Sequence, residues 1–232
     1  MLKVRQAADR GHFQADWLSS YHTFSFSTYY DPAHMGFRAL RVVNEDRVQP
    51  EGGFPLHPHR DMEILSLVLS GSLKHEDSSG NSVVIPAGGV QLISAGTGVQ
   101  HSEYNPSSDD EVHFLQIWIH PEQENLEPGY QFAEFDLWSD PDNLVPLANR
   151  SGSRGAVTIH QDVSIDYLNL SRGGRLEKEL AADRYAWVQV TGGVVDVSGE
   201  ALRAGDGLAI SDVQNINFSS ATGGELLLFD LA

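Results

Sequence analysis

The chain has 232 residues, which is long enough for one large β-sheet unit or two small domains, and its composition is that of a globular protein. A formal net charge of −17 argues against broad binding to nucleic acid, because that needs clustered Lys and Arg. With no cysteine, disulfides, zinc–thiolate sites and thiol nucleophiles are excluded. Any metal must therefore be held by His, Asp or Glu.

The first residues, MLKVRQAADRGH, lack the apolar region of a signal peptide, and no apolar run approaches the ~20 residues that span a bilayer. We therefore expect a cytoplasmic protein that binds neither membrane nor nucleic acid, and we expect a monomer.

The predicted elements are short runs of β-branched and aromatic residues bounded by turn residues, a pattern typical of a β-sandwich or barrel. Helical periodicity is nearly absent, although short helices are predicted at 16–20 and 141–144. The predicted strands are 37–43, 64–71, 81–86, 90–96, 112–119, 155–160, 165–170, 185–192, 193–199, 207–211 and 225–231.

The two halves of the chain repeat one layout. LSLVLSGSL (65–73) and VIPAGGVQLISAG (84–96) correspond to WVQVTGGVV (187–195) and LRAGDGLAIS (202–211). This degenerate internal duplication predicts two similar β-barrels in tandem, with the acidic segment 120–131 as the linker between them. We expect domains at 1–125 and 126–232.

Two pairs of residues carry the chemistry. His57 and His59 lie two apart in FPLHPHRDMEILSLVLSG (54–71), and His101 and Glu103 lie two apart in SAGTGVQHSEYN (94–105). Residues i and i+2 of a strand point to the same face, roughly 6.5–7 Å apart. A single H-x-H is weak evidence, but two pairs on neighbouring strands can surround one ion. Three imidazoles and a carboxylate suit Fe(II), Mn(II), Co(II), Ni(II), Cu(II) or Zn(II).

The pattern G53-x3-H57-x-H59-x3-E63-x7-G71, followed by P86-x-G88 and H101-x3-N105, resembles the two motifs of the cupin superfamily. More narrowly, HTFSF (22–26), HPHRDMEIL (57–65), SAGTGVQHSEYNPSS (94–108) and LQIWIHPE (115–122) look like the pirin family, and in particular its bacterial members described as quercetin 2,3-dioxygenases.

This resemblance implies an all-β bicupin, that is, two double-stranded β-helix (jelly-roll) barrels. It also implies one mononuclear divalent metal, with Fe(II) favoured, bound in the N-terminal barrel by His57, His59, His101 and Glu103. Glu63 is the general cupin ligand but is not usually a ligand in pirins, so it is expected beside the site. In the second half, Lys178 and Leu180 stand at the positions of His57 and His59, which implies a barrel without metal.

The function implied is a metal-dependent dioxygenase that opens a flavonol ring with dioxygen and releases carbon monoxide. Glu103 is then both ligand and catalytic base, and the partners are an aromatic or flavonol substrate and dioxygen. Eukaryotic pirins resemble this chain and are regarded as regulatory partners of transcription proteins. A non-enzymatic, metal-dependent binding module is therefore the main alternative, and a cupin isomerase or a sensor of a small molecule is a third, weaker one.

The remaining histidines and aromatics are expected to be structural. His113 is predicted to be a hydrogen-bonded residue of the core or the pocket wall, and His22 to fix the N-terminal segment. The aromatic cluster 21–30 is expected to pack rather than to form a ligand platform. Surface or loop positions are predicted for His12, His34, His75, His120 and His160.

Overall fold

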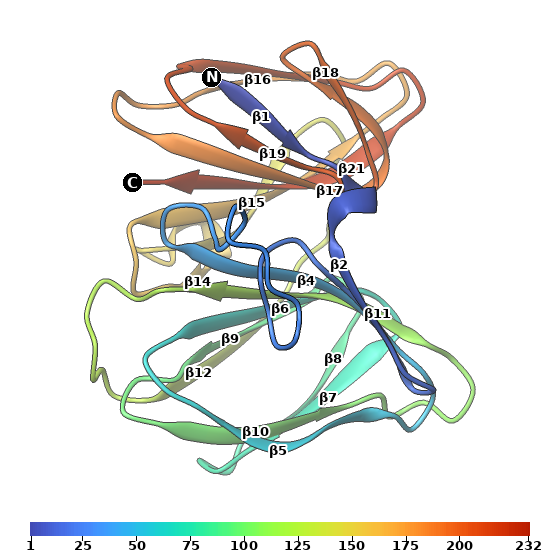
Figure 1. Ribbon diagram of the computed structural model, residues 1–232, viewed down its shortest axis with the longest axis vertical. Helices are drawn as coiled ribbons and strands as arrows, with labels where there is room; N and C mark the ends of the chain where they lie inside the picture. The colour runs from blue at the N-terminus through green and yellow to red at the C-terminus, as the bar shows by residue number, and fades with distance from the viewer. The chain divides into compact units, whose positions relative to one another are not determined.

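The computed structural model describes all residues, 1–232, and its regular structure is almost entirely β-strand (Figure 1). The all-β prediction is therefore confirmed. The helices are two single 3-10 turns, η1 (Ala7–Asp9) and η2 (Ser153–Gly155). No helix in the chain is long and apolar enough to cross a bilayer.

Both predicted helices are wrong. Residues 18–22 form strand β3 (Leu18–His22), in which Leu18, Ser20 and His22 are buried and alternate with half-buried residues. That period of two is a strand pattern, and a helix would turn these side chains to different sides. Residues 141–143 form a turn that leads into β13, in which the Asn143 side chain donates to Asp140 instead of starting a helix.

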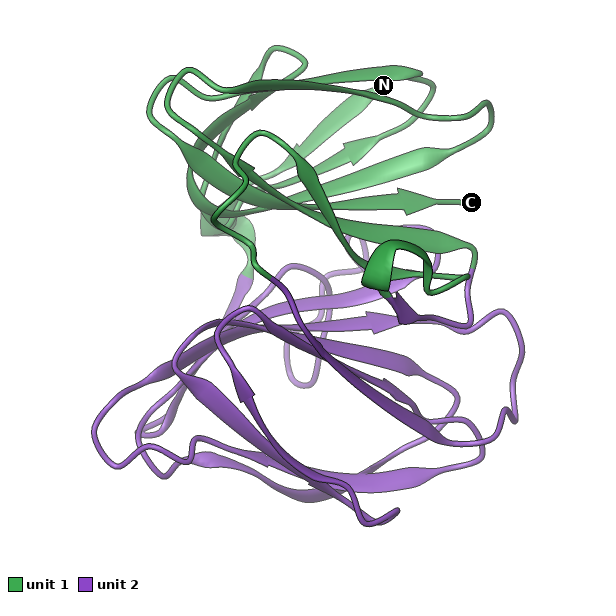
Figure 2. Cartoon of the chain, turned by 180° about the vertical axis from the view of Figure 1, so that it is seen from behind, with its two compact units in different colours: residues 1–10, 136–156, 162–232 green, residues 11–135, 157–161 purple.

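The chain divides into two compact units, coloured separately in Figure 2. Unit 1 comprises residues 1–10, 136–156 and 162–232, and unit 2 comprises residues 11–135 and 157–161. These units do not coincide with the expected segments 1–125 and 126–232. Strand β1 (Leu2–Arg5) pairs with β19 (Gly207–Ile210) of unit 1, and β12 (Gly129–Glu134), which lies beyond the expected boundary, pairs with β9 (Gly89–Ser94) of unit 2.

Unit 2 is built from two antiparallel sheets with the orders β5-β10-β7-β8 and β12-β9-β6-β11-β4-β3-β2. Leu73, Ile85 and Phe114 are among the fully buried side chains of its core. Its other strands are β2 (Gly11–Gln14), β4 (Leu40–Val48), β5 (Gly53–His59), β6 (Glu63–Ser70), β7 (Ser72–Asp77), β8 (Ser82–Pro86), β10 (Val99–Tyr104), β11 (Val112–Ile119) and β14 (Val157–Thr158).

Unit 1 has the sheet order β1-β19-β17-β21-β15-β13, and β16 and β20 form a further pair that joins β17 through β20. The predicted strands 185–192 and 193–199 are one strand, because Gly192 lies at a shift in the ladder rather than at a turn. Its remaining strands are β13 (Leu144–Asn149), β15 (Val163–Leu170), β16 (Arg175–Glu179), β17 (Tyr185–Val197), β18 (Glu200–Arg203), β20 (Asn215–Ser219) and β21 (Gly224–Leu231).

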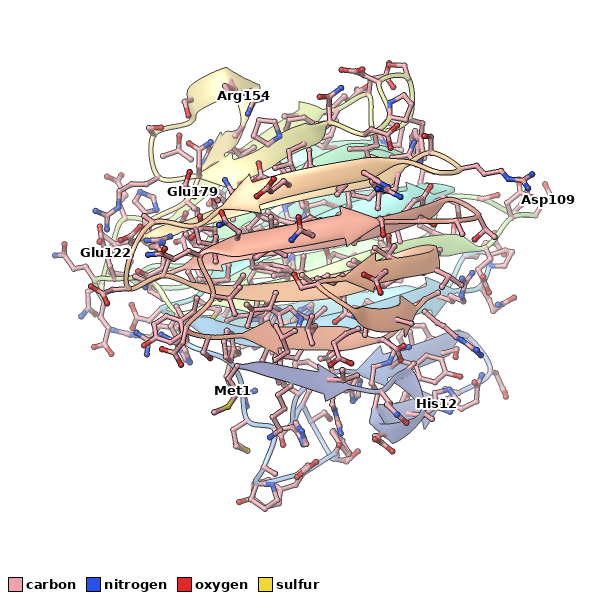
Figure 3. The ribbon with its side chains drawn as sticks, turned by 90° about the horizontal axis from the view of Figure 1, so that it is seen from above. Met1, His12, Asp109, Glu122, Arg154 and Glu179 are labelled. Atoms are coloured by element: carbon pink, nitrogen blue, oxygen red, sulfur yellow. The ribbon has the colours of Figure 1, made fainter.

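The interiors of the two units differ in chemistry. Unit 1 is filled with aliphatic side chains and Phe218, and Leu180, the counterpart of His59, is buried among them. All ten histidines of the chain lie in unit 2. The acidic excess lies outside: Asp109, Glu122 and Glu179 are exposed and project from the ribbon in Figure 3.

Candidate metal centre

Strands β5 and β10 bring the two sequence pairs together. In their antiparallel ladder His101 lies opposite His57 and Val99 opposite His59, whereas Glu103 lies opposite Phe54. The ladder shifts by one residue between His101 and Glu103, where β5 contains Pro55. Proline has no N–H to donate, so a bulge is a position where a strand tolerates it.

Three imidazoles converge at this point. Ring centroids are 4.8 Å apart for His57 and His59, 4.4 Å for His57 and His101, and 4.9 Å for His59 and His101. One nitrogen of each ring lies within 4.8 Å of the others. The edge of Trp118 packs against His59, with the centroids 4.9 Å apart. The structure therefore brings together three of the four residues predicted as ligands.

The proton position on His57 follows from its partner. Its Nδ1 lies 2.8 Å from the carbonyl oxygen of Pro55, which can only accept a hydrogen bond. Nδ1 must therefore carry the proton, and Nε2 keeps its lone pair. A backbone carbonyl that fixes the tautomer in this way is a common support of metal-binding histidines.

His101 is oriented by two residues of β7. Asp77 Oδ2 lies 3.2 Å from His75 Nε2, and His75 Nδ1 lies 3.4 Å from His101 Nδ1. Because the carboxylate accepts, His75 carries its proton on Nε2 and its Nδ1 accepts from His101. The remaining nitrogen, His101 Nε2, is buried and has no hydrogen-bond partner. This is the lone pair that a metal ion would use.

Asp77 is itself fixed by the turn between β7 and β8. Its carboxylate accepts from the backbone N–H groups of Ser79 and Asn81 and from the Asn81 side chain. Burial raises the pKa of Asp77, but the hydrogen bonds from Asn81, Ser79 and His75 outweigh it and leave the pKa below its usual range. Asp77 is therefore ionised at neutral pH.

Three imidazoles of the site, those of His59, His101 and His75, are neutral at pH 7. Burial, with the neighbouring His57, lowers the pKa of His59 to about 4. Burial, with the same neighbour and His59, lowers the pKa of His101 to about 2. Burial also lowers the pKa of His75. Neutral imidazole is the form that binds a metal, so His59 and His101 have no proton to give up at pH 7.

Glu103 lies beside the triad, held by side chains of the facing sheet. Gln91 Nε2 lies 2.5 Å from its Oε1, Gln116 Nε2 donates to its Oε2 at 2.8 Å, and the Ser66 hydroxyl lies 3.2 Å from Oε1. Burial raises the pKa of Glu103 to about 7, although these hydrogen bonds oppose the rise. An Oε atom of Glu103 lies within 4.8 Å of nitrogens of His75 and His101. Glu103 therefore lies next to the triad, on the side of His101.

Glu63 is directed elsewhere. Its Oε2 accepts from the Ser94 hydroxyl at 3.0 Å and from the backbone N–H of His160 at 3.1 Å. Glu63 does not share a face with His57 and His59, because the turn at 60–62, where Asp61 has φ 47°, carries the chain from one sheet to the other. Parity holds within one strand and is lost at such a turn.

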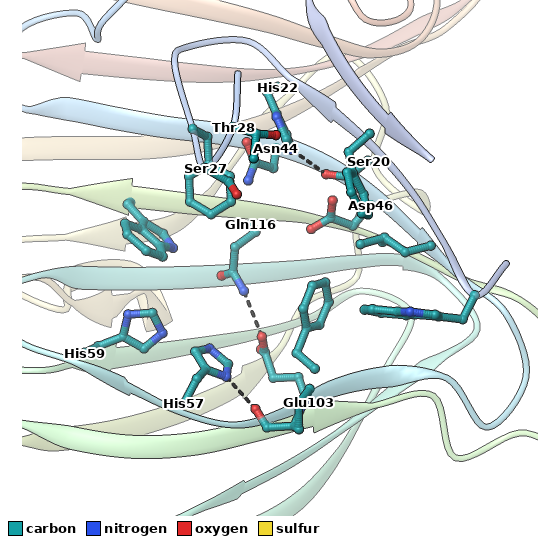
Figure 4. A pocket seen from close by; sticks show the side chains of 17 residues that line it. Ser20, His22, Ser27, Thr28, Asn44, Asp46, His57, His59, Glu103 and Gln116 are labelled. Atoms are coloured by element: carbon teal, nitrogen blue, oxygen red, sulfur yellow. Dashed lines mark hydrogen bonds between the residues drawn. The ribbon is translucent and has the colours of Figure 1, made fainter. Parts of the chain in front are cut away.

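A cavity of about 430 Å³ opens at the triad (Figure 4). His57, His59 and Glu103 lie at one side of it, with Gln116 between them and a second polar group that contains Asp46. Aromatic rings form much of the remaining wall: Phe13, Trp17, Phe26, Phe54 and Trp118. A largely apolar cavity with a few convergent polar groups is typical of a small-molecule site.

The other histidines correct several predictions. His75, expected at the surface or in a loop, is fully buried on β7 and stacks on Tyr130. A sequence signal existed, since LKHED follows the Gly71 turn and precedes DSSGN as one arm of a hairpin. His113 is a buried, hydrogen-bonded histidine, as predicted. Its partner is Glu45, and it does not line the cavity. His22 does line it, as does Phe26 from the cluster expected only to pack.

The donor set fits a divalent metal ion. Hydrogen bonds orient the rings of His57 and His101, His59 adds a third ring beside them, and a carboxylate lies next to His101. Nitrogen and oxygen donors of this kind suit first-row divalent metals. The two groups of residues that could hold a metal both lie in unit 2 and share His101.

Comparison with known proteins identifies the family of the chain. The family model described as "Pirin" matches residues 3–119, and the model described as "Quercetinase C-terminal cupin domain" matches residues 147–231. The chain belongs to the pirin family. Its two units are thus an N-terminal pirin cupin and a C-terminal cupin, and the resemblance seen in the sequence is confirmed.

Relatives match this pirin over its whole length. It is 45% identical to the quercetin 2,3-dioxygenase of Escherichia coli K12 over 231 residues, which cover 100% of this chain and 99% of that protein. It is 38% identical to a pirin-like protein of Caulobacter vibrioides, over 93% of each chain. The crystal structure of the bacterial pirin YhhW of E. coli in complex with nickel(II) superposes with a TM-score of 0.95 and 43% identity, covering 100% and 99% of the two chains.

Proposed function

We propose that this pirin is a metal-dependent dioxygenase of the quercetin 2,3-dioxygenase type, with His57, His59, His101 and Glu103 as the metal-binding residues. The observation that carries the proposal is the convergence of three imidazoles beside a buried carboxylate at the edge of a largely aromatic cavity. The name of the E. coli relative and the nickel(II) complex of YhhW support it.

When bound, a divalent ion supplies a Lewis acid that stabilises a deprotonated hydroxyl of the substrate. The protein supplies the proton acceptor. Glu103 is the carboxylate nearest the triad that lines the cavity. When it is released from the ion, burial raises its pKa to about 7, close to the pH at which a general base works best. Gln91 and Gln116 hold its two oxygens in place, so its orientation does not depend on solvent.

The reaction proposed consumes one flavonol and one dioxygen. Glu103 takes the proton of the 3-hydroxyl and returns it to the carboxyl group of the product, and both atoms of dioxygen enter the ring-opened ester. Carbon C3 leaves with its own oxygen as carbon monoxide, so atoms balance without a further reductant. The aromatic wall, including Phe26, Phe54 and Trp118, holds the flat rings and excludes water from the reacting carbons.

The test is anaerobic loading of the metal-free protein with Fe(II), Ni(II), Co(II), Mn(II), Cu(II) or Zn(II), followed by quercetin and dioxygen. We expect one carbon monoxide for each quercetin consumed, at a rate that depends on the ion, and Fe(II) is the ion we favour. If no metal form binds or consumes quercetin, the dioxygenase proposal is wrong and the metal-dependent binding module becomes the better reading.

Glu103→Gln tests the base. The amide keeps the shape of the side chain but accepts protons poorly, so we expect turnover to fall by about 10²- to 10⁴-fold. Glu63→Gln is the matched control, because Glu63 is also a buried carboxylate of unit 2 but binds Ser94 and His160 outside the cavity. A Glu103→Gln variant that keeps both metal and full turnover contradicts the assignment.

A further inference from the structure

The cavity has a second polar side that the proposed chemistry does not use. Ser20 and His22 of β3 and Asn44 and Asp46 of β4 line it across from His57, His59 and Glu103 (Figure 4). All four are buried. The four residues form two rows, that is, two cross-strand pairs of the same sheet: Ser20 pairs with Asp46, and His22 pairs with Asn44.

The register sets how far this group lies from the metal centre. Asn44 is directly opposite Gln116 on β11, and Gln116 donates to Glu103. Neighbouring strands are about 5 Å apart, and Asp46 lies two residues, about 7 Å, further along β4. The carboxyl group of Asp46 is therefore on the order of 10 Å from Glu103, which is about the length of two or three fused or linked aromatic rings.

Two oxygens of this group are buried without a protein partner: Asn44 Oδ1 and Asp46 Oδ1. Ser20 joins the two rows, since it lies within hydrogen-bonding reach of Asp46 and its hydroxyl is 2.9 Å from His22 Nε2. Buried polar atoms in folded proteins nearly always have a partner, because an unmade hydrogen bond is costly. The two residues that carry these oxygens line the cavity, so a molecule that fills the cavity is the nearest source of the missing donors.

The kind of ligand follows from the chemistry of these atoms. An amide oxygen accepts only, and a carboxylate accepts only when ionised and keeps acceptor capacity when protonated. The flanking walls are aromatic, with Phe13, Trp17 and Phe54 among them, and offer stacking surface. A matching ligand is a flat aromatic molecule with hydroxyl donors at the end remote from the metal.

We propose that Asn44 and Asp46 form a recognition subsite for the hydroxyl groups of a polyhydroxylated aromatic ligand, at the side of the cavity opposite the histidine triad. The subsite selects such ligands over aromatic compounds that carry only a metal-binding hydroxyl. The subsite rests on the proposed function, because that function determines which end of the ligand lies at the metal. Recognition itself is a binding property and is measured without turnover.

The test compares quercetin with 3-hydroxyflavone, which has the same flavonol unit but no other hydroxyl. Binding to the full chain loaded with Zn(II) is followed anaerobically through the fluorescence of Trp17 and Trp118, which line the cavity. The measured quantity is the ratio of the two dissociation constants. We expect quercetin to bind about 10- to 100-fold more tightly, the effect of a buried acceptor that is otherwise left without a donor.

Variants assign the effect to the subsite. Asp46→Leu and Asn44→Leu are expected to bring the ratio close to one, and Asp46→Asn, which keeps one acceptor oxygen, to lower it only in part. Glu45→Gln is the matched control: Glu45 is the neighbouring carboxylate on the other face of β4, bonded to His113, and its loss should leave the ratio unchanged. Thermal melting of each metal-free variant establishes that it is folded.

Equal affinities for the two ligands in the wild-type protein would overturn the subsite, because the unpartnered oxygens would then bind only solvent. The same holds if Asp46→Leu and Asn44→Leu weaken both ligands by the same factor. Failure of the dioxygenase proposal looks different: no carbon monoxide is formed, yet the ratio still depends on Asp46.

Discussion

At the scale of single residues, the metal centre depends on hydrogen bonds that determine where imidazole protons lie. The carbonyl of Pro55 places the proton of His57 on Nδ1, and the sequence of contacts from Asp77 through His75 places that of His101 on Nδ1. Both rings then direct Nε2 lone pairs to the centre. The residues that prepare the ligands are therefore as much part of the site as the ligands.

His75→Asn and Asp77→Asn test this arrangement. Loss of a supporting hydrogen bond to a metal-binding histidine typically lowers metal affinity 10- to 100-fold, and we expect that range for both variants. Competition with a chelator measures the affinity, and the visible spectrum of the Co(II) form reports any change in ligand geometry. His113→Asn removes another buried histidine with a carboxylate partner, away from the centre, and should change neither. Unchanged affinity in both test variants would contradict the orienting role.

Asp46 makes a prediction about pH. Burial raises its pKa to about 7, with a smaller rise from Glu45, whereas the unfolded chain has a value near 3.8. Between pH 4 and 7 the folded protein holds a proton that the unfolded chain has lost, so this group makes the fold less stable as pH rises. This loss of folding stability is complete above pH 7 and amounts to at most about 4 kcal/mol.

In Asp46→Asn this dependence is absent. We expect the melting temperature of the metal-free variant to exceed that of the same protein with Asp46 by an amount that grows from pH 5 to pH 8. Asp46 also raises the pKa of Glu103, so the comparison is made in a Glu103→Gln background, in which that neighbour does not titrate. Asp109→Asn, at an exposed position of a loop, is the control. Melting curves that stay parallel across this range would contradict the raised pKa.

At the scale of elements, strand β5 decides the geometry because it contributes two histidines and a bulge. Gly53 begins β5 opposite Tyr104, and a Cβ atom there would overlap the backbone oxygen of Glu103 and approach the Cα of Tyr104 to 2.6 Å. Only glycine lets β5 approach β10 this closely at that point. The spacing of His57 and His101 depends on the same ladder.

Gly53→Ala is therefore expected to push β5 away from β10. We predict a loss of stability of about 1–3 kcal/mol, the usual range for such overlaps, together with weaker metal binding. Denaturant titration and chelator competition measure the two effects. Gly129→Ala is the control, since a Cβ at Gly129 on β12 meets only Ser94 Cβ at 3.9 Å. Wild-type stability in Gly53→Ala would show that the strands tolerate the extra atom.

Predictability differs from element to element. The long apolar runs were predictable as strands because they must be buried, and β6, β9 and β11 appear close to their expected bounds. Polar strands such as β7 and β16 have no such run, so periodicity did not reveal them, and His75 was misplaced for that reason. Residues 16–20 were read as a helix because the alternation of Leu18, Ser20 and His22 is visible only once polar Ser20 is known to be buried.

At the scale of the whole molecule, the two units repeat a barrel layout, but the side chains in their interiors differ in chemistry. Unit 2 holds all the histidines and the cavity beside them, whereas the interior of unit 1 is filled by leucine, valine and isoleucine. In unit 1 the strand pair β16–β20, which corresponds to β5–β10, places Lys178 opposite Ile216. Metal binding should therefore stabilise unit 2.

Calorimetry with and without metal tests this expectation. A ligand that binds only the folded state at 100 times its dissociation constant stabilises it by about 2.7 kcal/mol, so the melting transition of unit 2 should rise on metal addition and fall with a chelator. In His57→Ala/His101→Ala the metal should have no such effect. A metal-induced rise that persists in this variant would place the ion elsewhere.

The sequence by itself determined the class of fold, the family, and the two residue pairs that meet at the centre. These depend on local patterns: strand period, turn residues, and ligands two apart. Only the tertiary structure decided that Glu63 faces His160, that His75 and Asp77 support His101, and that Asn44 and Asp46 face the cavity. Such contacts join residues of different strands, and their register is set by the packing of a whole barrel, which no local pattern records.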